Sequence, residues 1–251
     1  MIKISIITAV YNNREHLQNC FESVFSQTYS DIEYIVVDGG STDGTIDVIK
    51  KYSSKITTWI SEPDRGIYDA LNKGILMATG DVIGFLHSDD LLNSSETIAH
   101  IANSFEVTKA DAAYGDLVYI SKENPDKIIR YWKSSNFTPP LLRKGWMPPH
   151  PTLFVKSSWY KSKKGFRTDF RISADYDLIL RLFSDRNFKT CYLSEVITRM
   201  RLGGASNRSV KNIYLKSKED YIALKESKVG GFYTLFRKNF QKIIQFVVKP
   251  G

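Results

Sequence analysis

Cysteine is scarce in this sequence, and apolar residues never form a long uninterrupted run. Cys20 and Cys191 are the only two cysteines in 251 residues, and neither belongs to a CxxC pair or a Cys/His ligand pattern. A disulfide framework and a zinc site are therefore not expected, and both thiols should lie in the core. No stretch reaches the ~18 apolar residues of a membrane-spanning helix.

The sequence also lacks the marks of export and of disorder. It opens directly into an apolar strand-like segment, without a basic leader or a small-residue cleavage site. Repeats and low-complexity stretches are absent, and aromatic residues make up 13% of the chain. We therefore expect a cytoplasmic protein with one compact domain and a C-terminal extension.

Positive charge is in excess, with a formal net charge of +8. This excess predicts an acidic partner, which could be nucleic acid, anionic lipid or a phosphorylated substrate. The excess gathers beyond residue 211 and accompanies no recognised nucleic-acid motif, which argues against a nucleic-acid partner.

Strands and helices alternate through the first half of the chain. The strands are short apolar runs, and the first helix carries an apolar stripe of Leu17, Cys20, Phe21 and Val24 at helical spacing. This alternation predicts an α/β fold with a mostly parallel, doubly wound central sheet flanked by helices. The expected elements are residues 4–10, 15–25, 32–37, 45–52, 56–60, 68–78 and 82–86.

The pattern is less regular beyond residue 105. We expect strands at 112–120, 128–132, 152–155 and 192–201, a proline-rich loop at 138–151, and a helix at 174–184. The predicted organisation is a domain at 1–207, whose two halves are 1–105 and 106–207, followed by a basic helical tail at 208–251.

Polar residues follow four of the predicted strands, at 8–13, 38–44, 61–66 and 87–90. Ligands of open α/β sheets bind beyond the carboxyl ends of the strands, so these segments predict one wall of a nucleotide pocket. In the second segment Asp38 precedes a glycine-rich turn, where its carboxylate could accept hydrogen bonds from a base or ribose. The alternative is a tight turn capped by Ser41 or Thr42.

A second acidic motif, His87-Ser88-Asp89-Asp90, follows the apolar strand at 82–86. Two adjacent carboxylates at a strand exit suit Mg²⁺ or Mn²⁺ bridging a diphosphate, because these ions prefer oxygen ligands. Alternatively one of the two acids caps the next helix.

Five segments in order resemble family 2 glycosyltransferases of the GT-A fold, especially bacterial enzymes of O-antigen, capsule and colanic acid synthesis. The resemblance runs from about residue 2 to residue 207. It implies a catalytic domain at 1–207, with a nucleotide-sugar-binding half at 1–105 and an acceptor-binding half at 106–207. The segments are SIITAVYN (5–12), VDGGSTDGT (37–45), SEPDRGIYDALNKG (61–74), FLHSDD (85–90) and SADYDL (173–178).

The resemblance implies a set of donor-binding residues and a metal site. Asp89 resembles the metal-binding acid of the family's DxD motif, Asp90 would share the metal, and His87 occupies the position of the first acid. The donor-binding positions implied are Thr8, Tyr11, Asp38, Arg65, Asn72 and Ser88.

The resemblance also implies the catalytic base. The family usually carries a Glu-Asp pair, and this chain has Ala174-Asp175, so Asp175 is the predicted base. His150, Asp177 and Arg201 are predicted to contact the diphosphate or the acceptor. For each the alternative is a structural role, in a proline-rich loop, a helix start or a strand-to-helix turn.

The tail from residue 231 carries apolar residues at helical spacing, with basic residues and no acid on its other faces. This pattern predicts an interfacial amphipathic helix on anionic lipid, or else a terminal helix docked on the domain or on a partner. The apolar positions are Phe232, Leu235, Phe236, Phe240, Ile243, Ile244 and Val247.

The family resemblance implies an inverting transfer of a hexose or N-acetylhexosamine from a UDP-sugar. The acceptor would be a lipid-linked saccharide at the cytoplasmic face of the inner membrane, which suits the basic tail. A sugar nucleotidyltransferase is the rival enzyme class, but a basic glycine-rich activation loop near the N-terminus is missing. A non-catalytic basic binding module is the second rival.

Overall fold

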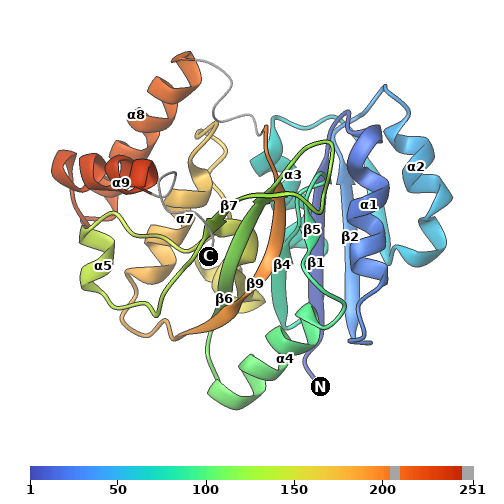
Figure 1. Cartoon of the computed structure of the whole chain (residues 1–251), viewed down its shortest axis with the longest axis horizontal. Coiled ribbons are helices and arrows are strands. Elements are labelled where there is room, and N and C mark those ends of the chain that lie inside the picture. The colour runs from blue at the N-terminus through green and yellow to red at the C-terminus, as the bar shows by residue number, and fades with distance from the viewer. Residues whose placement is uncertain (204–209, 245–251) are drawn as a thin grey trace.

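The computed structural model describes residues 1–203 and 210–244, which form a central mixed sheet between two layers of helices (Figure 1). The strands are β1 (Ile4–Val10), β2 (Ile32–Asp38), β3 (Thr58–Ser61), β4 (Val82–Phe85), β5 (Leu91–Leu92), β6 (Ala112–Ile120), β7 (Ile128–Trp132), β8 (Phe154–Lys156) and β9 (Thr190–Arg201). The helices are α1 (Arg14–Phe25), α2 (Thr45–Lys51), α3 (Ile67–Met77), α4 (Thr97–Thr108), α5 (Pro140–Arg143), α6 (Ser157–Ser162), α7 (Ala174–Phe183), α8 (Val210–Glu226) and α9 (Phe232–Ile244).

The first half of the sheet is parallel, as predicted. Strand order begins β3-β2-β1-β4, and all three pairings are parallel. Val10 pairs with Asp38, and Asp38 pairs with Ser61. The carboxyl ends of these strands therefore lie side by side, at the edge where ligands of such sheets bind.

Two apolar cores separate the sheet from its helices. On one face α1, α2 and α4 bury residues such as Phe21, Ile49 and Ile101 against the sheet. On the other face α3 and α7 bury residues such as Leu71 and Leu180. Successive strand residues alternate between these cores, which is why the strands carry unbroken apolar runs.

The second half of the sheet is mixed. The order continues β8-β6-β9-β5, with β8 antiparallel to β4 and β6, β9 parallel to β6, and β7 antiparallel to β6. Strands β6 and β7 have the bounds expected from the sequence, whereas β8 begins two residues later than expected. The short helices α5 and α6 and the two-residue strand β5 were not predicted.

Helices α8 and α9 pack beside α7 at one end of the molecule (Figure 1). The buried carboxylate of Asp220 on α8 accepts from Lys216 Nζ at 2.6 Å and from Lys238 Nζ of α9 at 2.8 Å. Lys238 Nζ also lies 3.1 Å from the ring centroid of Tyr176 on α7. These contacts join α9 to α8 and α7.

The tail helix α9 turns out to be docked through one face only. Leu235 and Lys238 are buried, whereas Phe232, Phe236 and Phe240 are exposed. The sequence pattern placed Leu235 on the same face as the phenylalanines. In the structure Leu235 lies on the buried face and the phenylalanines lie on the exposed face. Residues 204–209, and Val247 of the tail, lie outside the described residues.

The predictions for cysteine and for membrane spans can also be compared with the structure. Cys20 is buried and Cys191 half-buried, and neither is bonded to another cysteine. Burial raises the pKa of the Cys20 thiol to about 12. Within residues 1–203 and 210–244, every helix is too short or too polar to cross a bilayer.

Candidate functional site

A cavity of about 900 Å³ opens where the parallel strands end. Its wall combines the loops after β1 and β4, the start of α3, the loop before β8, the start of α7 and the end of β9. Helices α8 and α9 close one side with Lys216, Asp220 and Lys238. Six predicted site residues line this one cavity, namely Tyr11, Ser88, Asp89, His150, Asp175 and Arg201.

The two acids after β4 have different surroundings. Asp89 lies on the cavity wall. Asp90 is buried, its Oδ1 accepts the Arg201 backbone N–H at 3.1 Å, and its Oδ2 has no hydrogen-bond partner among the described residues. Burial and the neighbouring charge of Asp89 raise the pKa of Asp90 well above its usual range, against the opposing influence of Arg201.

Arg201 brings a buried positive charge to the same region from the end of β9. Its Nη1 donates to the Lys122 carbonyl oxygen at 3.0 Å. Its Nε and Nη2 are buried without a partner in the described part of the chain. A guanidinium has five donors in a fixed fork, so the remaining donors suit a phosphate group.

Asp175, in the first turn of α7, is held from two sides. Its Oδ2 lies 3.1 Å from His150 Nδ1, and its Oδ1 lies 3.3 Å from the Tyr68 hydroxyl, which also donates to the Ile172 carbonyl oxygen at 2.6 Å. These contacts orient the carboxylate while leaving its side chain 21% exposed to the cavity. A fixed, accessible carboxylate is what a general base requires.

His87, in the predicted metal-binding motif, lies beside His150, the partner of Asp175. Its ring centroid lies 5.7 Å from that of His150, in an edge-to-face arrangement. Burial lowers the pKa of His87, although Asp89 and Asp175 act to raise it. The lowered pKa favours the neutral imidazole, and an imidazole in either protonation state lacks the negative charge of an acid at this position.

Two of the predicted donor-binding residues are enclosed beneath the cavity wall. Thr8 is fully buried and its hydroxyl donates to the Leu86 carbonyl oxygen at 2.9 Å. Asp38 is also fully buried. Its Oδ2 accepts the backbone N–H groups of Gly40 and Ser41 at 3.1 and 3.0 Å and the Ser61 hydroxyl at 2.6 Å, while Oδ1 accepts the Ser41 hydroxyl.

The Asp38 turn nevertheless borders the cavity through its neighbours. A Cβ atom at Gly39 would collide with the Asp64 carboxylate and would touch the Tyr11 ring. Both Asp64 and Tyr11 line the cavity. The turn thus supports two residues of the cavity wall.

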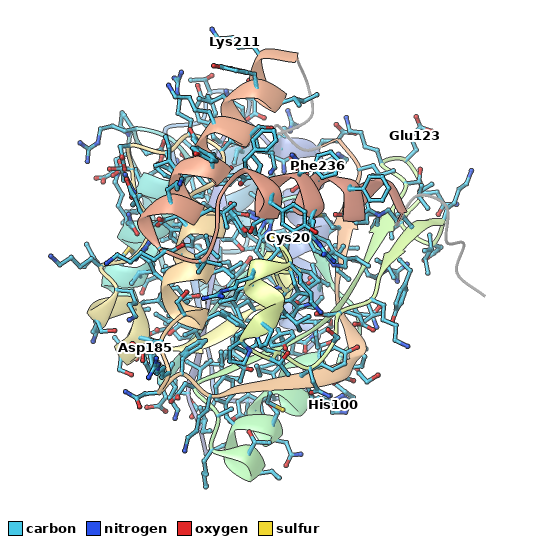
Figure 2. All side chains as sticks on the ribbon, turned by 90° about the vertical axis from the view of Figure 1, so that its left-hand side faces the viewer. Cys20, His100, Glu123, Asp185, Lys211 and Phe236 are labelled. Atoms are coloured by element: carbon cyan, nitrogen blue, oxygen red, sulfur yellow. The ribbon has the colours of Figure 1, made fainter. Side chains whose placement is uncertain are left out.

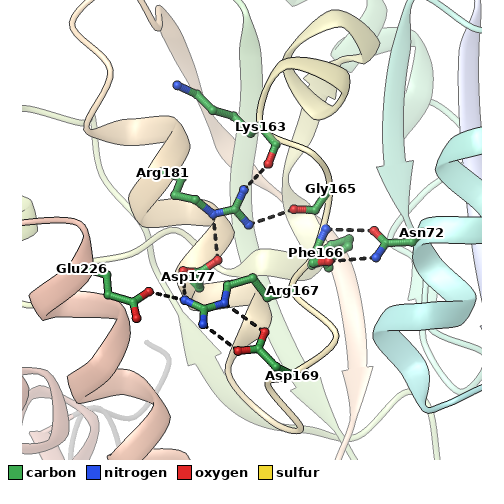
Figure 3. Close-up of polar contacts among 9 residues, drawn as sticks. All are labelled: Asn72, Lys163, Gly165, Phe166, Arg167, Asp169, Asp177, Arg181 and Glu226. Carbon is green, nitrogen blue, oxygen red and sulfur yellow. Dashed lines mark hydrogen bonds and ion pairs between the residues drawn. The ribbon is translucent and has the colours of Figure 1, made fainter.

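Three further predicted residues lie away from the cavity. Asn72 forms a reciprocal pair with the backbone of Phe166, at 2.8 Å in both directions, and Asp177 accepts from Arg181 Nε at 2.8 Å (Figure 3). Burial raises the pKa of Asp177, while Arg181 opposes that change. The side chain of Arg65 is 81% exposed and lies 3.3 Å from Asp69.

Sequence reasoning missed Glu219 on α8. Its buried carboxylate accepts three successive backbone N–H groups, those of Arg171, Ile172 and Ser173, at 2.8 to 2.9 Å. This segment leads directly into the first turn of α7, so Glu219 fixes the approach to Asp175. The only available signal was an acidic pair, Glu219-Asp220, within a basic tail.

The candidate metal site offers two carboxylates. Among the described residues no group of three His, Cys, Asp or Glu side chains is arranged to hold a metal. Mg²⁺ and Mn²⁺ need no such protein cage, because these ions commonly bind one or two carboxylates together with waters and substrate phosphates. Asp89 on the wall and the unpartnered Asp90 Oδ2 fit that mode of binding.

Comparison with known proteins agrees with the fold and the cavity. The family model described as glycosyl transferase family 2 matches residues 5–171. A PGL/p-HBAD biosynthesis glycosyltransferase of Mycobacterium bovis is 30% identical over 217 residues, which cover 84% of this chain and 82% of that protein.

Solved structures share the fold at low sequence identity. The S. aureus protein TarS, residues 1–349 in complex with UDP-GlcNAc, superimposes with a TM-score of 0.71 at 18% identity, covering 91% of this chain and 66% of that one. The mannosyltransferase PcManGT from Pyrobaculum calidifontis, in complex with GDP-Man and Mn²⁺, gives 0.67 at 16% identity, covering 95% and 69%.

The α/β architecture of the chain is therefore GT-A-like, as in these solved structures, and the sequence matches identify it as a glycosyltransferase. The chain belongs to glycosyl transferase family 2.

Proposed function

We propose that this enzyme is an inverting transferase that moves a hexose or N-acetylhexosamine from a UDP-sugar to a saccharide carried on a lipid diphosphate. The observation that carries the proposal is the convergence of Asp89, Arg201 and Asp175 on one cavity. Inversion by a single displacement needs an activated acceptor hydroxyl and a stabilised leaving diphosphate on opposite sides of the sugar. These residues supply both functions.

Asp175 is the proposed catalytic base. It accepts the proton of the acceptor hydroxyl as that oxygen attacks the anomeric carbon, and the bond from that carbon to the diphosphate breaks. His150 and Tyr68 hold the carboxylate during this transfer. Such proton transfer typically contributes about 10²–10⁴-fold to the rate.

The leaving diphosphate is proposed to bind beside Asp89, Asp90 and Arg201. The free donors of Arg201 would pair with its oxygens, and Tyr11 and Ser88 would border the nucleoside end of the donor. A bound Mg²⁺ or Mn²⁺, held by Asp89 and Asp90, would supply Lewis-acid neutralisation of the departing charge. The Mn²⁺ in the PcManGT complex supports the choice of metal.

The UDP-sugar donor is supported by the UDP-GlcNAc complex of TarS. The lipid-linked acceptor, the inner-membrane location and a role in O-antigen or capsule synthesis rest on the resemblance and on the basic tail. Thr8, Asp38, Arg65 and Asn72 remain predicted donor-site residues, and His150 and Asp177 remain predicted contacts of the acceptor or diphosphate.

The test is a screen of purified protein against a panel of UDP-sugars, with a synthetic sugar-diphosphate-lipid as acceptor and Mn²⁺ present. We expect one UDP-sugar to release UDP and to yield a product of inverted anomeric configuration. Turnover with a nucleoside triphosphate and a sugar phosphate instead, with no UDP released from any donor, would replace this proposal by a nucleotidyltransferase.

A further inference from the structure

Helix α9 presents an exposed aromatic ridge to solvent. Phe232, Tyr233, Phe236 and Phe240 are 75, 68, 60 and 52% exposed. Phe236 and Phe240 stack on one another, with ring centroids 6.2 Å apart. Figure 2 faces this side of the molecule and labels Phe236 on α9. Exposing four large rings on one helix is unfavourable unless a partner covers them.

The ridge adjoins a basic hollow of about 640 Å³. Five cations line it, and Tyr233 and Arg237 belong to both the hollow and α9. No carboxylate lines it, and within residues 1–203 and 210–244 none of the five cations forms an ion pair. The five cations are Arg143, Lys144, Lys225, Lys228 and Arg237.

The opposite face of α9 anchors the helix to the protein. Leu235 and Thr234 are buried, and Lys238 reaches Asp220 at 2.8 Å. These three residues fix which side of α9 faces the protein. The exposed rings lie on the side that faces away from it.

We propose that the ridge and the basic hollow together bind a bilayer that contains anionic phospholipids, with headgroup phosphates in the hollow and the four rings among the acyl chains near the interface. Aromatic rings are favoured at this depth, and cations are attracted to the anionic surface. A second copy of the chain is a poor occupant, because it would bring an equally basic hollow to the same face.

This docking gives the catalytic cavity a definite position. Lys238 lines the cavity from the inward face of α9, while Phe236 and Phe240 point to the other side. The cavity therefore lies one helix away from the lipid surface. On the proposed function, the saccharide of the acceptor would enter the cavity while its lipid chain stays in the bilayer.

The experiment is flotation of the full chain with vesicles, which needs neither donor nor acceptor and so is independent of the proposed transfer reaction. We expect binding to vesicles with about 30% phosphatidylglycerol and little binding to pure phosphatidylcholine. The charge-reversal variant Lys144→Glu/Arg237→Glu should lower partitioning at least about 30-fold, which corresponds to about 1 kcal/mol for each cation. Phe236→Ser/Phe240→Ser should lower it by at least about tenfold.

Matched control variants lie at the other end of the molecule or on other helices. Lys50→Glu/Lys51→Glu makes the same change in net charge on α2, and Leu76→Ser/Val107→Ser removes two exposed apolar side chains from α3 and α4. Both should float like the wild type, and all four variants should keep its thermal midpoint. Equal binding to neutral vesicles, equal losses in the controls, or a wild-type chain that shifts an oligonucleotide but never floats would each overturn the proposal.

Discussion

Two sets of buried or half-buried acids border the strand ends, and they differ in how their oxygens are satisfied. Asp38 accepts hydrogen bonds at both oxygens from its own turn and from Ser61. Asp90, in the loop after β4, has an oxygen without a partner in the described residues, and Asp89 faces the cavity. An acid whose two oxygens both accept hydrogen bonds within the protein stabilises the fold, whereas an acid with an unpartnered oxygen is free to bind a ligand.

This comparison separates effects on activity from effects on stability. Removing an acid that faces the cavity should abolish chemistry and leave folding intact. Removing an acid whose oxygens are all hydrogen-bonded should destabilise the protein, because several donors lose their acceptor together. The following variants test each side of the contrast.

The largest effect is expected for Asp175→Asn. The amide cannot accept the acceptor's proton, so transfer should fall by about 10²–10⁴-fold. UDP binding, measured by calorimetry, should stay within a few-fold of wild type. Full transferase activity in this variant would reject Asp175 as base, and Asp47→Asn on the exposed side of α2 serves as a control that should change neither quantity.

Metal removal should be nearly as severe. Treatment with EDTA should silence the enzyme, and added Mn²⁺ or Mg²⁺ should restore it, since the leaving diphosphate would otherwise lack neutralisation. Asp89→Ala should show the same loss without rescue by added metal, while its thermal midpoint should match wild type. Turnover that persists in EDTA would remove Asp89 and Asp90 from the proposed role.

Asp38→Ala tests the acid whose two oxygens are both hydrogen-bonded within the protein. Several hydrogen bonds to one buried carboxylate disappear together, and the expected loss is about 4 kcal/mol of unfolding free energy. Chemical denaturation followed by circular dichroism would measure it, with Asp47→Ala as the exposed control. An unchanged stability would mean that the turn does not depend on this acid.

A smaller, pH-dependent effect is expected at Glu33, a buried acid near the other end of β2. Burial raises its pKa, but hydrogen bonds from Ser5, Thr79 and Lys3 outweigh this and lower the pKa to about 2, from 4.5. The lowered pKa contributes about 3 kcal/mol of stability above pH 5, which is lost as the pH falls toward 2.

Thermal midpoints from pH 7 to pH 2 would check this for Glu33→Gln. The variant should be less stable than wild type at pH 7, and the gap should close in acid. The exposed Glu106→Gln should follow the wild-type curve throughout. A difference in thermal midpoint that stayed constant with pH would show that protonation of Glu33 does not control stability.

Local pattern was sufficient to predict the parallel half of the sheet. The apolar runs of β1, β2 and β4 and the stripe of α1 depend on periods that can be counted along the chain. The antiparallel placement of β8 could not be predicted, because pairing depends on contacts between distant segments. Strand β5 has only two residues, too few for any period.

The site was predictable in part for the same reason. Asp89 and Asp175 belong to contiguous motifs, and both line the cavity. The Tyr68 and Glu219 contacts join segments that are far apart in sequence, and no local pattern announces them. Likewise helical periodicity placed Leu235 with the phenylalanines, because it could not foresee that Lys238 would be buried against Asp220.

The Glu219 contact has a consequence for synthesis of the protein. The three amides that lead into α7 are translated before the carboxylate that binds them, so a chain still emerging from the ribosome lacks the acceptor for those amides. The segment that leads into the proposed base, Asp175, can gain this support only after α8 has been synthesised. The contact therefore forms late in translation.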